Sequence, residues 1–268
     1  MKIQPALIEQ KDGSYKACFP GVTEEFIEEA LKKILTIQNY GIHDSNNIET
    51  WVRFSLNMIQ RELKARNRTR NLNQIKHAIE VMNKCNIAVF KNNKEIWSGA
   101  ILQDLVTVGR DEYLADTDTQ HIARLPLFIS HSINRLEYRQ FNYDRLMSCD
   151  EQLTRWMYKK LINRFIQASY MTEYSFMYSD MKQASGLLQQ ERERDNRNKV
   201  ISALNELQEK SIISSYETDE RKKGRSIIDV KYTIKAASGF IAEQKAANKR
   251  TNDTETKALN LEIQSVEK

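Results

Sequence analysis

The sequence predicts a mainly α-helical protein of the α+β class, with small β-hairpins and two similar units in tandem. Three observations lead to this prediction. First, the chain of 268 residues has only 8 glycines and 3 prolines, about a third of average usage, so few residues break helices. Second, apolar residues recur at helical spacing in several segments. Third, the order of predicted elements in the first half recurs in the second half.

The first unit begins with three predicted helices, each with one apolar stripe. The first covers residues 23–35. Thr23 is its predicted N-cap, and glutamates precede lysines along it, as the helix dipole favours. The second helix is predicted over residues 48–65. The third begins at Asn71, which stands at capping-box spacing from Gln74.

Two predicted strands follow the third helix. Residues 87–90 and 95–102 are rich in apolar and β-branched side chains, and the turn-forming segment 91–94 separates them. Three helices followed by a hairpin is the element order of a winged helix-turn-helix domain.

The second half repeats this order. Its predicted elements are a helix over 151–166, a strand over 174–178, a short helix over 179–186, a longer helix over 192–209, and strands over 212–216 and 227–234. The last two strands flank a long basic tip, residues 219–225. The repetition therefore predicts two tandem winged helix-turn-helix domains.

We expect three regions along the chain. Residues 1–140 form an N-terminal winged-helix domain preceded by an arm, and residues 141–240 form a C-terminal winged-helix domain. Residues 241–268 read as a charged, flexible tail because their composition is strongly polar.

Positive charge is concentrated where such a domain meets DNA. The net charge is only +5, but residues 53–76 hold seven basic residues and one acidic residue. This block covers the end of the second helix, the turn and the start of the third, which contact phosphates and enter the major groove in helix-turn-helix domains. The predicted DNA contacts of the first unit are Arg61, Lys64, Arg66, Arg68, Arg70, Asn73, Gln74, Lys76 and His77.

Basic residues recur at corresponding places in the second unit: in its first helix, at the start of its third helix and at the hairpin tip. The predicted DNA contacts there are Arg155, Lys159, Lys160, Arg192, Arg194, Arg197, Asn198, Lys199, Ser202, Arg221, Lys222, Lys223 and Arg225. This coincidence favours binding of double-stranded DNA over a merely solvated helix face. One alternative stays open, because Glu191, Glu193 and Asp195 alternate with the arginines and could pair with them within the helix.

Polar side chains near the start of each third helix are the candidates for reading bases. Asn and Gln suit adenine, and Arg and Lys suit guanine. For Asn71 and Gln74 the alternative role is helix capping.

The sequence predicts no catalysis, metal or cofactor. The four histidines lie in no metal-binding pattern, the three cysteines form no CxxC pair, and no Gly-rich nucleotide loop is present. Tyr138, Tyr143 and Tyr158 would suit a DNA-nicking enzyme, but the histidine cluster that should accompany them is missing. The sequence also lacks a long apolar run and a signal peptide, so we expect a cytoplasmic protein that does not enter the membrane.

A series of short motifs, in order along the chain, carries a resemblance to a known family. Residues 19–31 (FPGVTEEFIEEAL) are similar to a helix of pattern PG…EE…ALRK, and residues 53–64 to the helix after it. Residues 138–143 (YRQFNY) and 153–161 (LTRWMYKKL) resemble the stretch YRQYNY…LARWLHKRL. Further similar segments are 185–186, 192–197, 200–207, 229–230, 238–240 and 247–250. The family is that of bacterial plasmid replication initiators of the iteron-binding type.

The resemblance implies tandem winged-helix domains that bind DNA repeats at the replication origin of a plasmid or other mobile element. It further implies opening of an AT-rich region, recruitment of the host initiator and the replicative helicase, and the existence of both homodimers and monomers. Two alternatives stay open from the residues alone. One is a dimeric winged-helix transcriptional repressor or copy-number regulator, which needs the same surfaces. The other is a winged-helix protein-interaction module without a DNA role.

Overall fold

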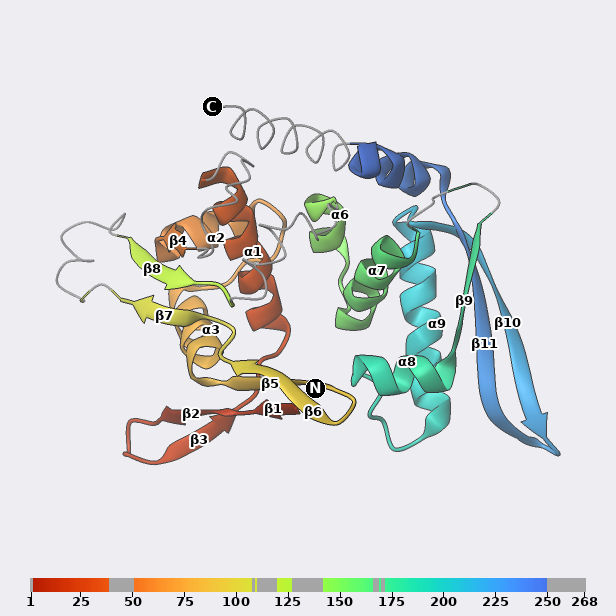
Figure 1. Cartoon of the computed structure of the whole chain (residues 1–268), viewed down its shortest axis with the longest axis horizontal. Helices are drawn as coiled ribbons and strands as arrows, with labels where there is room; N and C mark the ends of the chain where they lie inside the picture. Colours follow the sequence, from red (N-terminus) through yellow and green to blue (C-terminus); the bar gives the residue numbers. More distant parts are fainter. Residues whose placement is uncertain are drawn as a thin grey trace, which may run out of the picture. The chain divides into compact units, whose positions relative to one another are not determined.

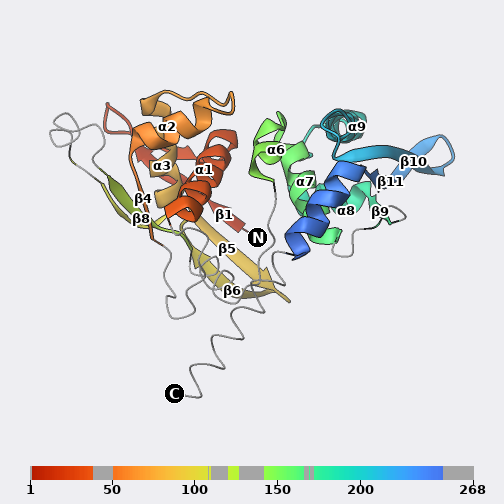
Figure 2. The same ribbon diagram turned by 90° about the horizontal axis from the view of Figure 1, so that it is seen from above.

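The computed structural model describes residues 2–38, 51–107, 109, 120–126, 142–165, 169 and 172–249. The chain divides into two units, Met1–Tyr138 and Arg139–Lys268. Each unit combines helices with small antiparallel sheets (Figures 1 and 2). The predicted α+β class is therefore confirmed.

Unit 1 contains helices α1 (Val22–Gln38), α2 (Leu56–Lys64) and α3 (Leu72–Lys84). Its strands are β1 (Lys2–Gln4), β2 (Ala6–Glu9), β3 (Tyr15–Cys18), β4 (Trp51–Phe54), β5 (Asn86–Lys91), β6 (Lys94–Gly99), β7 (Gln103–Val106) and β8 (His121–Arg124). They form the sheets β1-β5-β6, β2-β3 and β4-β8-β7. The sequence predicts the β5–β6 hairpin, but not β1 to β3, β7 or β8.

Helix α1 begins one residue earlier than predicted, and a glutamate rather than a threonine caps it. The Gly21 N–H donates to Glu24 Oε2 at 2.7 Å. Thr23 lies inside α1, and its hydroxyl accepts a hydrogen bond from Arg70 Nε at 3.1 Å. The N-cap prediction for Thr23 is therefore wrong, because the longer Glu24 side chain reaches back to an N–H that the helix leaves unpaired.

The second helix is shorter than the predicted 48–65, because Trp51–Phe54 form strand β4. Burial alternates along this strand: Val52 and Phe54 are buried, while the residues between them are exposed. The strand pairs antiparallel with β8, a partner far away in the sequence. Ser55 then caps α2, since its side chain accepts a hydrogen bond from the Met58 N–H at 3.1 Å.

Helix α3 confirms the predicted capping box. Asn71 Oδ1 accepts from the Gln74 N–H at 2.8 Å, and Gln74 Oε1 accepts from the Asn71 N–H at 3.0 Å. After the β5–β6 hairpin, the Leu102 N–H donates to the Met82 carbonyl at 3.1 Å. Strand β6 therefore ends at Gly99 rather than at residue 102, because the chain turns back onto α3.

Unit 2 contains helices α6 (Tyr143–Ser148), α7 (Gln152–Arg164), α8 (Tyr178–Ser185) and α9 (Glu193–Glu209), and residues 238–249 are also helical. Its strands β9 (Glu173–Met177), β10 (Ile213–Lys223) and β11 (Ser226–Ala236) form one sheet in the order β10-β11-β9 (Figure 1). The predicted elements are confirmed, and α6 is an addition to them. Gly186 ends α8 in the left-handed conformation, with φ 65°, which favours glycine.

The strands of the unit 2 hairpin are longer than predicted. Strands β10 and β11 pair out to Lys223 and Ser226, so most of the predicted tip 219–225 belongs to the strands and only a tight turn remains. Gly224 has φ +63°, a conformation that side chains disfavour. The basic residues of the tip therefore stand on strand ends rather than on a loop.

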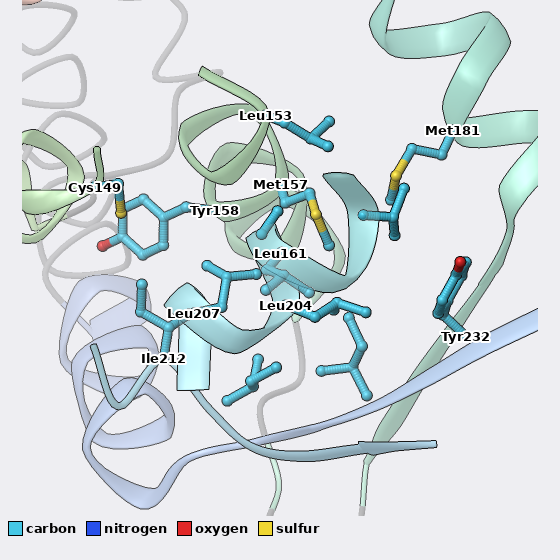
Figure 3. Packing of buried hydrophobic residues seen from close by; sticks show 14 of the residues in the cluster. Cys149, Leu153, Met157, Tyr158, Leu161, Met181, Leu204, Leu207, Ile212 and Tyr232 are labelled. Atoms are coloured by element: carbon cyan, nitrogen blue, oxygen red, sulfur yellow. The ribbon is translucent and has the colours of Figure 1, made fainter. Parts of the chain in front are cut away.

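The core of unit 2 lies between α7, α9 and the sheet. Figure 3 shows Leu153, Met157 and Leu161 of α7 with Leu204 and Leu207 of α9 in one buried cluster. These helical repeats of three and four residues are the ones that the sequence pattern predicts.

The predicted flexible tail is wrong for its first part. Residues 238–249 form a helix, in which Ile241, Gln244 and Ala247 of the predicted tail are buried together with Phe240 just before that tail. The Phe240 ring packs edge-on against Tyr158 and Phe165, with centroid distances of 6.0 and 5.8 Å. The polar composition of the segment conceals this helix, because few of its residues are large and apolar. The rest of the predicted tail lies outside the described residues.

None of the helices in the described ranges combines the length and the apolar content that crossing a membrane requires.

The start of α7 is held by a side chain from α9. Glu151, at the N-cap position, makes no side-chain capping bond. Instead Glu206 accepts hydrogen bonds from the Asp150 N–H and from the Thr154 hydroxyl, both at 2.5 Å. A carboxylate at this position satisfies unpaired donors and favours the positive end of the helix dipole.

We expect Glu206→Ala to lower the free energy of unfolding of the chain by about 2 kcal/mol, because it leaves these donors unsatisfied. Urea denaturation measures the change. The control is Glu209→Ala, an exposed glutamate on the same helix, with an expected effect within about 0.5 kcal/mol. Equal losses in both variants would contradict the capping role.

Candidate nucleic-acid interface

Three predicted contacts of unit 1 share the exposed side of α3. Asn73, Lys76 and His77 are exposed, whereas Ile75 and Ala78 on the opposite side are buried. Residues three and four apart lie on one side of a helix. We call Asn73, Lys76 and His77 the α3 face.

Gln74 is exposed as well, but its side chain is occupied in the capping box at the start of α3. The capping alternative is thus confirmed for Asn71 and Gln74. A side chain held in this way orients the first turn of α3, on which Asn73 stands.

The positive charge of Lys76 also affects the pKa of a buried histidine. His121 of β8 is 8% exposed, and its ring lies 5.6 Å from that of Phe54. Burial, and then the positive charge of Lys76, lower the pKa of His121. His121 is therefore neutral at neutral pH and adds no charge to this side of unit 1.

The arginines of the turn between α2 and α3 make contacts within unit 1. The guanidinium carbons of Arg68 and Arg70 lie 5.2 and 5.8 Å from the centre of the Phe26 ring. Arg66 Nη1 lies 3.0 Å from Glu62 Oε1. These half-buried side chains tie the turn to α1 and α2.

Arg61 and Lys64 are exposed on α2, close in sequence to that turn. Gln60 also stabilises the turn, since its amide nitrogen donates to the Arg70 carbonyl at 2.9 Å. The sequence places one further basic residue, Arg53, in this block, but it stands on strand β4. The basic block of unit 1 is thus divided among a strand, a helix, a turn and the α3 face.

In unit 2 the exposed side of α9 gathers four predicted contacts. Arg194, Asn198 and Ser202 are spaced by one helical turn, and Lys199 stands beside them. All four are exposed, while the opposite side of α9 packs into the core. We call these four residues the α9 face. The Ser202 hydroxyl donates to Glu151 Oε1 at 3.1 Å, so part of this residue faces α7.

Glu193, an acidic residue at the start of α9, bonds to side chains of α8. Glu193 hydrogen-bonds to Lys182 and Tyr178 of α8, and these bonds lower the pKa of Glu193. The half-buried Arg197 lies within electrostatic reach of the same carboxylate. Glu193 therefore pairs with α8 in addition to its interaction with Arg197 within the helix.

A buried asparagine positions the chain before α9. Asn196 is fully buried, and its amide exchanges two hydrogen bonds of 2.9 Å with the backbone N–H and carbonyl of Gln190. Arg192, the N-cap residue, is exposed at the end of this segment. The segment thus enters α9 in a fixed geometry.

The hairpin tip of unit 2 carries four exposed cations, Arg221, Lys222, Lys223 and Arg225. Lys222 Nζ lies 2.8 Å from Glu220 Oε2, so one of the four is paired on its own strand. The sequence therefore places its basic residues correctly on the surface of the tip.

Arg155 is not on the surface, and its prediction as a DNA contact is wrong. The side chain is 0% exposed, and Nη1 donates to the Cys149 and Asp150 carbonyls at 2.9 and 3.0 Å. It joins the start of α7 to the end of α6. Residues on more than one side of α7 are buried, because both α6 and α9 pack against it.

The other two predicted contacts of α7 are accessible. Lys159 is half-buried, and Lys160 is exposed with its Nζ 5.3 Å from the centre of the Trp156 ring. The aromatic side chains beside these cations are not among the predicted site residues. Their spacing in the sequence, one turn from Trp156 to Lys160, could have indicated the contact.

No known protein-family model matches the chain, and no curated protein sequence matches it. Solved structures resemble it, among them the Pi initiator protein and domains of RctB. The Pi initiator protein in complex with iteron DNA has a TM-score of 0.51 and 11% sequence identity, over 88% of this chain and 98% of that one. The chain and the Pi initiator protein share a fold. Domains 2 and 3 of RctB give a TM-score of 0.48 at 13% identity, over 87% of this chain and 91% of that one.

The resemblance to initiators seen in the sequence motifs is therefore confirmed at the level of the fold. The similarity spans both units, because it covers most of both chains. An identity of 11% leaves the individual contact residues to be argued from this chain alone.

We expect Arg155→Ala to lower the free energy of unfolding by about 3 kcal/mol, because it leaves a cavity and two unpaired carbonyls in a buried junction. Chemical denaturation measures the loss. Arg164→Ala, an exposed arginine on the same helix, serves as control with an expected loss below about 1 kcal/mol. A neutral Arg155→Ala would show that the junction does not need this side chain.

Proposed function

We propose that this protein is a plasmid-type replication initiator that binds repeated double-stranded DNA sites at an origin. Each unit acts as a winged helix-turn-helix, with α3 and α9 as the helices that enter the major groove. The observation that carries the proposal is that both helices expose a polar and basic side near their start. The shared fold with an initiator whose structure contains iteron DNA supports it.

The α3 and α9 faces have the side chains needed to read bases. Asn73 and Asn198 can each donate to and accept from adenine, and Arg194 and Lys76 can donate to guanine. A helix fits the width of the major groove, and the residues of its first turns reach the base edges. Such contacts contribute about 1–3 kcal/mol each to the discrimination between bases.

The remaining exposed cations hold the phosphate backbone. In unit 1 these are Arg61 and Lys64, with the turn arginines beside them. In unit 2 they are Arg192 and the cations of the hairpin tip. Each neutralised phosphate releases counterions, so the affinity falls steeply as salt rises.

The proposal assigns the protein no catalytic step and no cofactor. DNA binding at the repeats would itself prepare the origin, and the host initiator and the replicative helicase would then act on it. A repressor with the same surfaces would bind DNA equally well. The two roles therefore have to be separated by replication and not by binding.

Base readout by the α9 face can be measured with variants of that face. After selection of the preferred site from random duplex DNA, we expect Arg194→Ala and Asn198→Ala each to weaken binding to that site by about tenfold or more. Binding to random duplex should change much less. Asn163→Ala, an exposed asparagine of α7, is the matched control. Equal losses on both duplexes would show that the α9 face contacts only the backbone.

The same variants separate initiation from repression. A plasmid whose only origin carries the selected repeats should replicate with the wild-type gene and be lost with Arg194→Ala. Retention of that plasmid without the protein, with repression of a promoter carrying the repeats, would assign the repressor role instead.

Phosphate contacts by the hairpin tip can be measured through the salt dependence of DNA binding. We expect Arg221→Ala with Lys223→Ala to weaken binding to every duplex and to reduce the slope of log affinity against log salt by about 2. Lys11→Ala with Lys16→Ala removes two exposed cations of unit 1 outside the proposed interface and should leave the slope unchanged. A slope unaffected by the tip variant would exclude phosphate contacts there.

A further inference from the structure

Unit 2 has a hollow lined by residues of α7, α8 and the strand β9. Its volume is about 230 Å³, larger than the cavity of about 150 Å³ that holds a benzene molecule in a well-studied protein. Aromatic side chains line it: Trp156, Tyr174 and Phe176. The hollow therefore has room for one large apolar side chain.

Buried residues close the hollow on its inner side. Met157 and Leu161 of α7 and Met181 of α8 belong to its lining and to the core cluster (Figure 3). Ala184 of α8 lines it as well and is exposed. The α9 face and the hairpin tip contribute nothing to this lining, and Lys160 is the one lining residue that is also a predicted DNA contact.

Two cations stand at the outer side of the hollow. Lys160 Nζ lies 5.3 Å from the centre of the Trp156 ring, and Arg164 Cζ lies 5.8 Å from that of Tyr174. Both side chains are exposed, and within the described part of the chain neither has a carboxylate within 4.0 Å. Asp180 is the one acidic residue of the lining. The entrance therefore carries a net positive charge.

We propose that this hollow binds an acidic peptide segment of a partner protein. The segment would insert an aromatic or branched aliphatic side chain between Trp156 and Phe176, and its carboxylates would pair with Lys160 and Arg164. An apolar centre with charged groups at its edge is the usual composition of a protein-binding site. Single-stranded nucleic acid fits less well, because bases need open ring faces for stacking, and here cations lie over two of the rings.

The proposal does not depend on the proposed DNA function, and its test contains no duplex. The probe is a fluorescein-labelled peptide of twelve residues in which Asp and Glu flank a central Phe-x-x-Leu. Fluorescence anisotropy measures its binding to the whole chain. We expect Ala184→Trp, which fills the hollow, and Arg164→Glu, which reverses one charge, each to weaken binding by about tenfold.

Two further variants keep the test decisive. Lys249→Glu reverses an exposed charge that is not part of the lining, and it should leave peptide binding unchanged. Asp180→Asn removes the single acid of the lining and should strengthen binding, a gain that loss of folding cannot produce. Thermal unfolding, expected to be unchanged, verifies that Ala184→Trp is folded.

The proposal is overturned if the wild-type chain does not bind the peptide, or if Ala184→Trp and Arg164→Glu bind it as well as the wild type does. It is also overturned if labelled oligo(dT) of twelve nucleotides binds and is lost in Ala184→Trp while the peptide does not bind. That result would assign the hollow to single-stranded nucleic acid.

Discussion

The apolar side of α9 packs into the core of unit 2, and this packing determines which side of the helix is exposed to solvent. Val200, Leu204 and Leu207 are fully buried against α7 and the sheet, and this fixes the rotation of α9 about its axis. Hydrogen bonds also fix the position of α9. Asn196 bonds to the chain before the helix, and Glu206 bonds to the start of α7. This packing places Arg194, Asn198 and Ser202 along one exposed side of the helix. Without the packing, that arrangement would be lost.

The cations of this chain fall into two groups that the sequence does not separate. Arg155 is enclosed by carbonyl oxygens, and Arg145 bonds to the Lys210 and Ser211 carbonyls and to Glu243. Arg155 thus joins two consecutive helices, and Arg145 joins elements that are distant in the sequence. The cations at the hairpin tip extend into solvent instead. A count of basic residues therefore overstates the surface available to an anionic partner, because some of the charge stabilises the fold.

Local signals allowed most elements to be predicted, and non-local pairing explains most of the errors. The Asn71–Gln74 capping box and the apolar repeat of α9 are contained within single segments, so the sequence alone reveals them. Strand β4 has an apolar content that also suits a helix, and only its pairing with β8 makes it a strand. Likewise β1 pairs with β5 across most of unit 1. The burial of Arg155 depends on the connection between α6 and α7, which a helical pattern does not show.

The long hairpin of unit 2 has a consequence for the solubility of the protein. Strand β10 forms one edge of its sheet, and an open edge can pair with another molecule and start aggregation. From Glu217 to Lys223 every residue of this edge is exposed, and all but Thr218 are charged. Charged side chains of both signs along such a strand discourage a second strand from adding to it. The residues proposed to hold phosphates would thus also keep copies of the protein apart when no DNA is bound.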